Sequence, residues 1–286
     1  MTVAPSVRRM LLVPLLAMAA LPMAPRVVHA QADTIAGAPA RLFTLNDALL
    51  GAGVALATLA IRPLDEQLAA AVTDSGTQAN RKLRRLASFV RTTAEPGSYL
   101  IGGTMYLAGR LSGNAKLADV GLHGTEALAI GEAAAVLIKG MVGRQRPSVK
   151  PRNSHSYGLL RGFREGDDYR SFPSGHTVAG FAAAAAVTSE VSRYAPGAVW
   201  VVGPALYGGA ALVGASRMYN NRHWASDVIV GAGIGTFAGL KTVRWHHTHA
   251  GNTIDRVFLT GALVPGDGIG DVRWSIVPAS FVSARH

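Results

Sequence analysis

The sequence predicts an all-α protein, a bundle of six helices. The chain has 286 residues, of which 49% are hydrophobic and only 16% are charged, so it can bury a full core. Its mean hydropathy of +0.23 excludes a disordered chain. Apolar stretches rich in alanine and glycine recur between loops that contain arginine, proline and glycine. Their lengths are typical of packed helices rather than of strands.

The first element is a predicted secretory signal peptide at residues 1–30. Arg8 and Arg9 precede an apolar run from residue 10 to residue 23, and Val28-His29-Ala30 resembles a cleavage site. An uncleaved membrane anchor is the alternative, although the run is shorter than the roughly 20 residues that a span needs. Both interpretations place the chain in the export pathway.

A helical domain is predicted over residues 41–245. Its connecting segment 62–91 is polar and amphipathic, which indicates a pair of surface helices. The six helices of the bundle are predicted at 46–61, 98–111, 120–138, 176–189, 198–215 and 228–240.

Two environments fit this bundle. Segment 198–215 has 18 residues without a charge and could span a membrane, and small residues are common where membrane helices pack closely. Segment 120–138, in contrast, carries His123, Glu126 and Glu132, and we interpret the two glutamates as lining a polar bundle interior. We expect a membrane-embedded bundle, and a soluble bundle stays the alternative.

The side of the membrane is a separate question. Six spans after a cleaved signal would put the loops 139–176 and 217–227 in the cytoplasm, in agreement with their positive charge. An exported site needs one span fewer. We favour a bacterial inner-membrane protein whose site faces the periplasm, and a soluble periplasmic protein is the alternative.

The C-terminal tail, residues 246–286, differs from the helical domain. Residues 257–282 contain β-branched and aromatic side chains around Pro265-Gly266-Asp267-Gly268, which predicts one or two short strands joined by a turn. His246, His247 and His249 precede them and are consistent with a metal site. A solvated interfacial patch is the interpretation we favour.

Charge and cysteine content exclude several functions. The chain has no cysteine, so disulfides, zinc–cysteine sites and thiol catalysis are excluded. Its net charge of +11 comes largely from scattered arginines near glycines, with one basic cluster at residues 81–85. This distribution suits a compact phosphate better than a nucleic acid, and we expect no nucleic-acid partner.

Three short motifs carry the predicted chemistry. The first begins at Lys139, at the end of an apolar helix, and ends at Arg146-Pro147. The second is Pro173-Ser174-Gly175-His176, a small-residue turn before the alanine-rich helix, where free backbone N–H groups favour an anion. The third runs from Ser216-Arg217 to Asp227. The arginine forks match phosphate oxygens two at a time.

Two histidines complete this predicted phosphoryl-transfer site. His223 and Asp227 are four residues apart, so on a helix the carboxylate would fix the imidazole tautomer and leave its other nitrogen free to attack. His176 lies at the anion-binding turn, where it could protonate a leaving oxygen. Side chains and backbone N–H groups supply the nucleophile, its orienting group, the acid and the anion-binding donors, so we expect no metal and no cofactor.

The motifs resemble the three-part signature of the type-2 phosphatidic acid phosphatase superfamily: Lys, six residues, Arg-Pro; then Pro-Ser-Gly-His; then Ser-Arg, five residues, His, three residues, Asp. The resemblance implies a helical bundle and a phosphohistidine mechanism. It implies that His223 is the nucleophile, Asp227 its orienting group and His176 the general acid and then base. It also implies that five residues hold the phosphate: Lys139, Arg146, Ser174, Gly175 and Arg217.

The function expected from these features is a lipid phosphatase. Its substrate would be a lipid phosphate such as phosphatidic acid or a polyprenyl diphosphate. A soluble exported acid phosphatase of broad specificity is the first alternative, and a vanadium haloperoxidase is a remote one. In the loop 148–171, His155, Tyr157 and Asp168 are candidates for substrate selection, although a plain surface loop explains them equally well.

Overall fold

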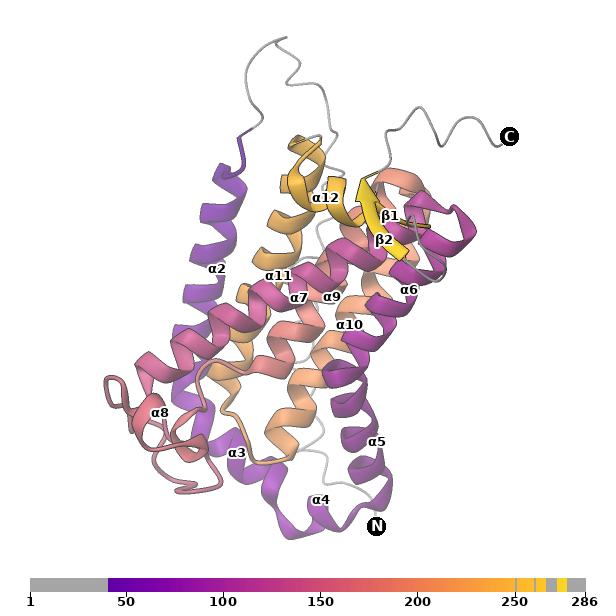
Figure 1. Ribbon diagram of the computed structural model, residues 1–286. Coiled ribbons are helices and arrows are strands. Elements are labelled where there is room, and N and C mark those ends of the chain that lie inside the picture. Colours follow the sequence, from indigo (N-terminus) through magenta and orange to yellow (C-terminus); the bar gives the residue numbers. More distant parts are fainter. Residues whose placement is uncertain (1–40, 250, 260, 266–271, 277–286) are drawn as a thin grey trace.

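The computed structural model describes residues 41–249, 251–259, 261–265 and 272–276. The predicted signal peptide lies outside the described residues. Figure 1 shows a bundle in which α9 (Gly175–Tyr194) runs beside α10 (Val199–Tyr219) and α11 (Ala225–Thr248). These three helices, with α7 (Ala115–Val142), enclose the core.

All six predicted bundle helices are present. Besides the four above, they are α2 (Leu45–Ile61) and α6 (Ser98–Ser112). Helix α11 extends furthest beyond its predicted range, to Thr248, and α7 begins early, at Ala115, because the side chain of Asn114 caps it by accepting a hydrogen bond from Leu117 N–H.

The segment predicted as a surface helix pair contains three α-helices. A 3-10 turn (Arg62–Leu64) leads from α2 into α3 (Asp65–Thr73), and α4 (Ser75–Ala79) and α5 (Arg81–Thr92) follow. The extra boundaries arise from two capping side chains. Asp74 caps α4 and Asn80 caps α5, each accepting two backbone N–H hydrogen bonds. A π-helical turn (Thr93–Gly97) then connects α5 to α6.

Close packing of α9 against α11 sets the geometry of the centre. Gly231, Gly235 and Gly239 lie on the face of α11 that meets α9. A Cβ atom at Gly235 would be 2.3 Å from the carbonyl oxygen of Val178, so only glycine allows this approach. The alanines of α9 fill the same interface and are buried. The loop before α11 is thereby held beside the N-terminus of α9.

The outer faces of the bundle are strongly apolar. The segment Leu45–Thr73 and the segment Pro196–Tyr219 are both long and apolar enough to cross a membrane, with mean hydropathies of 1.4 and 1.6. None of the apolar window in the first segment is buried. Leu56 and Leu59 of the first segment are exposed, and exposed Leu107 on α6 and Leu137 on α7 extend this surface to other helices. An exterior of this kind is unusual for a soluble monomer.

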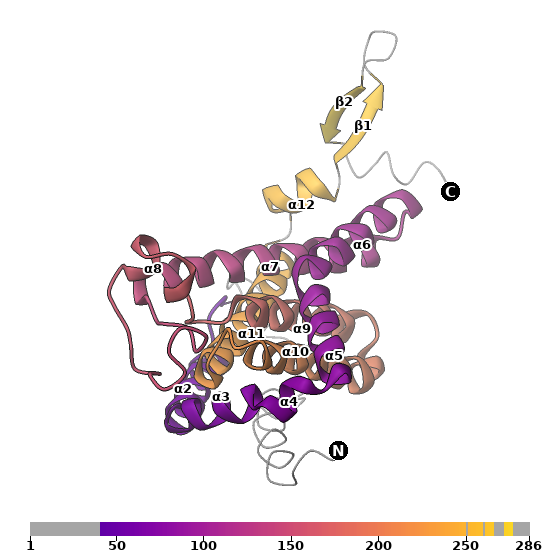
Figure 2. The ribbon, with the colours of Figure 1, turned by 90° about the horizontal axis from the view of Figure 1, so that it is seen from below.

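The last described elements are a short helix and a hairpin. Helix α12 (Thr253–Phe258) is followed by β1 (Gly261–Pro265) and β2 (Val272–Ile276), which pair antiparallel with Gly261 opposite Ile276. Figure 2 shows the hairpin projecting away from the bundle, beyond α12. The strands agree with the prediction, whereas α12 was not foreseen. The residues of the predicted turn, 266–268, lie outside the described residues.

Candidate active site

The three predicted motifs meet at one end of the bundle. Lys139 is in the last turn of α7 and Arg217 in the last turn of α10, while Ser174 precedes α9. His223 lies in the loop before α11. The backbone N–H of Ser174 donates to the carbonyl oxygen of Asp227 at 3.1 Å, which joins the second motif to the third.

The N-terminus of α9 forms the floor of a predicted phosphate cradle. Lys139 Nζ donates to the carbonyl oxygen of Pro173 at 2.6 Å and lies within 3.3 Å of that of Arg170. A Cβ atom at Gly175 would be 3.7 Å from Lys139 Nζ, so the first residue of α9 lies directly beside this amine. The Lys139 amine thus lies beside the positive end of the helix dipole, and an anion bound there would favour the charged form of this amine.

Arg217 adds a buried cation with spare hydrogen-bonding capacity. Its side chain is only 7% exposed. Its Nε atom is buried and has no hydrogen-bond partner among the described residues. Buried donors are rarely left unpaired in native proteins. An oxyanion bound at this end of the bundle would satisfy this donor.

His223 is oriented with one ring nitrogen toward the arginines. Its Nδ1 lies 2.6 Å from the carbonyl oxygen of Ser171, which can only accept, so Nδ1 carries the proton. Its Nε2 lies 3.4 Å from Arg146 Nη1. Burial lowers the pKa of His223 to about 3, and the charges of Lys139 and Arg146 act in the same direction. The ring is therefore neutral at pH 7, with the Nε2 lone pair available for attack.

The predicted contact between His223 and Asp227 is not direct. Asp227 Oδ2 lies 3.8 Å from His223 Nδ1, which is too long for a hydrogen bond. Asp227 instead accepts from Ser171 Oγ at 2.5 Å and from the backbone N–H of Trp224 at 2.9 Å. Ser171 therefore connects the two, because its carbonyl binds the ring and its hydroxyl binds the carboxylate. An orienting role of Asp227 would act through Ser171.

Arg144 is a structural residue of this site that the sequence analysis did not single out. Its side chain is 1% exposed and lies between Asp65, at 2.7 Å, and Asp227. It also donates to Ser226 Oγ at 2.7 Å and to the carbonyl oxygen of Ser154 at 2.8 Å. The arginine links α3 to the start of α11 and holds Asp227 in place.

We predict that Arg144→Met lowers the free energy of unfolding by about 3–5 kcal/mol, because it leaves two buried carboxylates without their cation. Chemical denaturation in detergent would measure this. Arg84→Met, at an exposed position of α5, is the matched control and should change stability by less than about 0.5 kcal/mol. Equal stability of both variants would show that the buried pairs contribute nothing.

Arg146 is held in place by the loop between α7 and α9. Its guanidinium contacts Asp167 Oδ1 at 2.6 Å, and its backbone N–H donates to the carbonyl oxygen of Asp168. Arg222 also pairs with Asp167. Burial opposes ionisation of Asp167, but hydrogen bonds and charge from the two arginines lower its pKa overall. The loop 148–171 thus positions a phosphate-binding residue.

His176 has a partner that the sequence did not reveal. Its Nδ1 lies 2.9 Å from Glu95 Oε2, in the turn between α5 and α6. The hydrogen bond from His176 lowers the pKa of Glu95, so the carboxylate is charged at neutral pH. The pair is partly exposed, at 21% for the histidine and 39% for the glutamate, as a proton donor facing an incoming substrate must be.

Comparisons with known proteins decide the family. The sequence profile described as the PAP2 superfamily matches residues 122–250, the region that holds all eight predicted site residues. Residues 122–250 belong to the PAP2 superfamily. This confirms the family expected from the three motifs.

Two individual relatives of this PAP2 protein are informative. A lipid A 1-phosphatase of Porphyromonas gingivalis is 42% identical over 85 residues, which are 30% of this chain and 18% of the relative's length. A crystal structure of a transmembrane PAP2-type phosphatidylglycerolphosphate phosphatase from Bacillus subtilis superposes with a TM-score of 0.54 at 18% identity. It covers 73% of this chain and all of that one, and so confirms the helical fold.

Proposed function

We propose that this PAP2 protein hydrolyses a lipid phosphate, as a monoester or a diphosphate, through a phosphohistidine intermediate. The observation that carries the proposal is the convergence of Lys139, Arg146 and Arg217 around a neutral, buried His223. This arrangement offers fixed positive charge to a phosphoryl group and an uncharged nucleophile beside it.

The proposed reaction has two steps. In the first, His223 Nε2 attacks phosphorus, the P–O bond to the leaving group breaks, and His176 gives its proton to the departing oxygen. In the second, His176 takes a proton from water, the water oxygen attacks phosphorus, and the P–N bond breaks to release inorganic phosphate. Lys139, Arg146, Ser174, Gly175 and Arg217 hold the phosphoryl oxygens in both steps. Ser171, bound to Asp227, keeps the proton of His223 on Nδ1.

An apolar cavity of about 630 Å³ between α2, α7 and α11 supports a lipid substrate. Ile138 and Val230 line one end of it, and these residues lie next to Lys139 and three residues after Asp227 in the chain. Trp245 and Leu42 line the other end. An acyl or isoprenyl chain would match both its apolar walls and the exposed apolar faces of the bundle.

The proposed location is the bacterial inner membrane, with the site on the periplasmic side. The apolar exterior and the candidate spans support the membrane, and the predicted signal peptide supports export. Detergent phase partitioning of fractionated cells tests this, because an integral protein enters the detergent phase. Recovery of the active protein in the aqueous phase would instead identify a soluble exported acid phosphatase.

The substrate class is tested by assaying the purified protein on matched lipid and soluble phosphates. Phosphatidic acid, a polyprenyl diphosphate, lipid A and phosphatidylglycerolphosphate represent the lipids, and glycerol phosphate is the soluble counterpart. We expect kcat/KM for at least one lipid to exceed that for glycerol phosphate by 100-fold or more, because the apolar cavity binds only the lipid. Equal values would contradict the lipid proposal.

Catalysis is predicted to be independent of metal ions. Each role in the two steps belongs to a side chain or a backbone donor, so EDTA is expected to leave the initial rate unchanged at a temperature well below unfolding. Loss of activity that a divalent ion restores at that temperature would contradict the proposed site. Vanadate should inhibit competitively, because it mimics the five-coordinate transition state. Vanadate-dependent halide oxidation would favour a haloperoxidase.

Glu95 is predicted to position His176 for proton transfer. Its carboxylate lies 2.9 Å from His176 Nδ1, so Glu95→Gln is expected to slow the first turnover of a lipid phosphate by about tenfold or more and that of p-nitrophenyl phosphate much less, because the aryl ester needs little acid assistance. Glu165→Gln, which removes an exposed carboxylate that pairs with Arg161, is the control and should leave both rates unchanged. An equal loss for both esters would limit Glu95 to a structural role.

A further inference from the structure

A second cluster of ionisable side chains lies at the opposite end of the bundle. We call it the distal cluster, and its members are His123, Glu126, Glu190, His246, His247 and Asp255. They come from α7, α9, α11 and α12, of which only α11 and α12 are neighbours in the sequence. Glu190 follows His176 on α9 by 14 residues, which at 1.5 Å per residue is about 21 Å along the helix. The distal cluster is therefore separate from the phosphate site.

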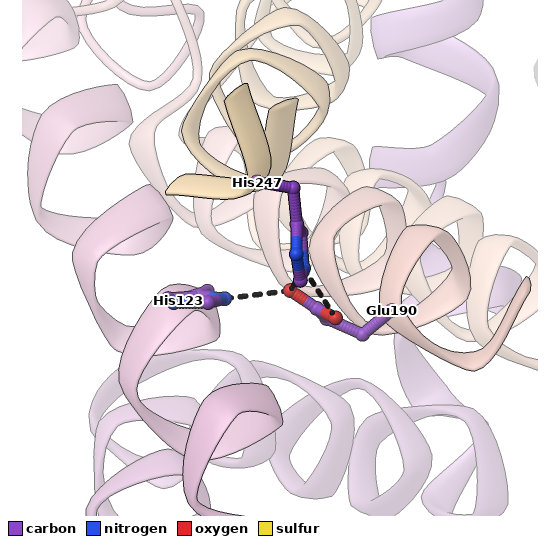
Figure 3. A group of neighbouring side chains, drawn as sticks. All are labelled: His123, Glu190 and His247. Atoms are coloured by element: carbon purple, nitrogen blue, oxygen red, sulfur yellow. Dashed lines mark hydrogen bonds and ion pairs between the residues drawn. The ribbon is translucent and has the colours of Figure 1, made fainter. Parts of the chain in front are cut away.

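Three of these side chains converge on a single point (Figure 3). Glu190 Oε1 lies 2.6 Å from His123 Nδ1 and 2.9 Å from His247 Nε2, and these ligand atoms all lie within 4.8 Å of one another. Glu190 is fully buried, His123 is 2% exposed and His247 is 21% exposed. Two imidazole nitrogens and a carboxylate thus face one another at the distal end.

The remaining members extend the cluster from the His123 ring. Its Nε2 lies 3.5 Å from Asp255 Oδ1, and the His123 ring stacks on that of His246 with 3.9 Å between centroids. His246 in turn lies between Asp255 and Glu126, at 2.6 Å from each. A histidine that binds a metal through one nitrogen typically gives its other N–H to a carboxylate, and Asp255 occupies that place beside His123.

The charge of the cluster also favours a cation. Its three carboxylates can carry three negative charges into a largely buried volume, where unpaired charge is costly. Glu190 has no lysine or arginine among its ion-pair partners in the described residues, only the two histidines. A divalent ion between the three ligands would neutralise this charge and leave the imidazoles in their neutral, metal-binding form.

We propose that His123 Nδ1, His247 Nε2 and Glu190 bind a divalent transition-metal ion, with Zn²⁺ the best match to two imidazoles and one carboxylate. Around a tetrahedral zinc ion the ligand atoms stand about 3.3 Å apart. The separations of 2.6 Å and 2.9 Å between Glu190 Oε1 and the two imidazole nitrogens would therefore widen by less than about 1 Å on binding. The half-buried His247 side leaves access for a water molecule as fourth ligand. The ion would tie α7, α9 and α11 together.

The role assigned to this metal is structural and distinct from the metal-independent reaction proposed above. Its removal is expected to lower the melting temperature and leave the initial rate intact at temperatures where the apoprotein stays folded. A result that contradicts one of the two proposals therefore leaves the other intact. A zinc requirement in catalysis would contradict the proposed mechanism, whereas absence of zinc binding would contradict only the distal site.

The test uses the full chain in detergent, purified through a tag without histidine and freed of metal by dialysis against a chelator. Titration with ZnCl₂ alone, followed by calorimetry and elemental analysis, is expected to give one zinc ion per chain and a higher melting temperature. His247→Ala should weaken binding at least tenfold. His249→Ala, an exposed histidine two residues along and outside the cluster, is the matched control.

A spectroscopic measurement on the wild-type protein covers the case in which His247→Ala does not fold. X-ray absorption of the zinc-loaded protein is expected to show two imidazole ligands and an oxygen-rich remainder. No stoichiometric zinc in the wild type, binding by His247→Ala equal to that of the control, or a spectrum without imidazole scattering would overturn the proposal. In each of those cases the distal cluster would consist of histidine–carboxylate ion pairs only.

Discussion

His223→Ala is expected to abolish turnover of every phosphate substrate, by at least about 10⁴-fold in kcat, because the covalent intermediate cannot form without Nε2. The neighbouring groups do not replace it. Lys139 is engaged with the carbonyl oxygen of Pro173, and Arg146 is paired with Asp167. The other histidine of the site, His176, is paired with Glu95. The loss should be the same for aryl and alkyl esters, since both pass through the same intermediate.

The intermediate itself can be trapped. Labelled substrate is mixed with enzyme and quenched within milliseconds into an alkaline denaturant, because acid hydrolyses the P–N bond of phosphohistidine. Peptide mapping is expected to find the label on His223. His249→Ala, an exposed histidine on the far end of α11, should retain full activity and full labelling. Wild-type activity in His223→Ala, or label on another residue, would refute the mechanism.

The fold was predictable because each bundle helix corresponds to a continuous sequence pattern. Apolar stretches of alanine and glycine correspond to the six bundle helices, and α9 agrees with its predicted range to within a few residues. Helix boundaries that depend on a single capping side chain were not predictable in this way. Asp74 and Asn80 divide a polar segment into separate helices through hydrogen bonds that hydrophobic periodicity does not register.

The site was predictable from motifs but its supporting contacts were not. The expected direct pair of His223 and Asp227 assumed that both lie on one helix, whereas α11 begins at Ala225 and His223 precedes it. Glu95 contacts His176 across 81 positions of sequence, and Arg144 reaches Asp65 across 79. Such pairs depend on how helices pack, and no local spacing encodes them. His246, His247 and His249 illustrate the same limit. They were interpreted as a solvated patch, yet His246 is only 3% exposed, while His249 is exposed.

His176→Ala is expected to separate substrates by the basicity of their leaving group. A general acid typically accelerates a reaction by about 10²–10⁴-fold, and this acceleration is largest when the leaving oxygen is strongly basic. An alkyl phosphate leaves as an alkoxide, whereas p-nitrophenyl phosphate leaves as a stable phenolate. We therefore expect the first turnover of a lipid phosphate to slow by about 10²–10⁴-fold and that of the aryl ester to slow by less than about tenfold.

The comparison has to use the first turnover rather than the steady state. His176 is also the proposed base for water, so the variant should release one equivalent of p-nitrophenol quickly and then stall as the phosphoenzyme. Rapid mixing would record this burst, and the stalled label should again map to His223. Ser192→Ala, an exposed position near the other end of α9, is the control and should show neither a stall nor a substrate difference. Only a group that acts on the leaving oxygen can distinguish an alkoxide from a phenolate. If His176→Ala slows the first turnover equally for both ester types, the proton on the leaving oxygen therefore does not come from His176.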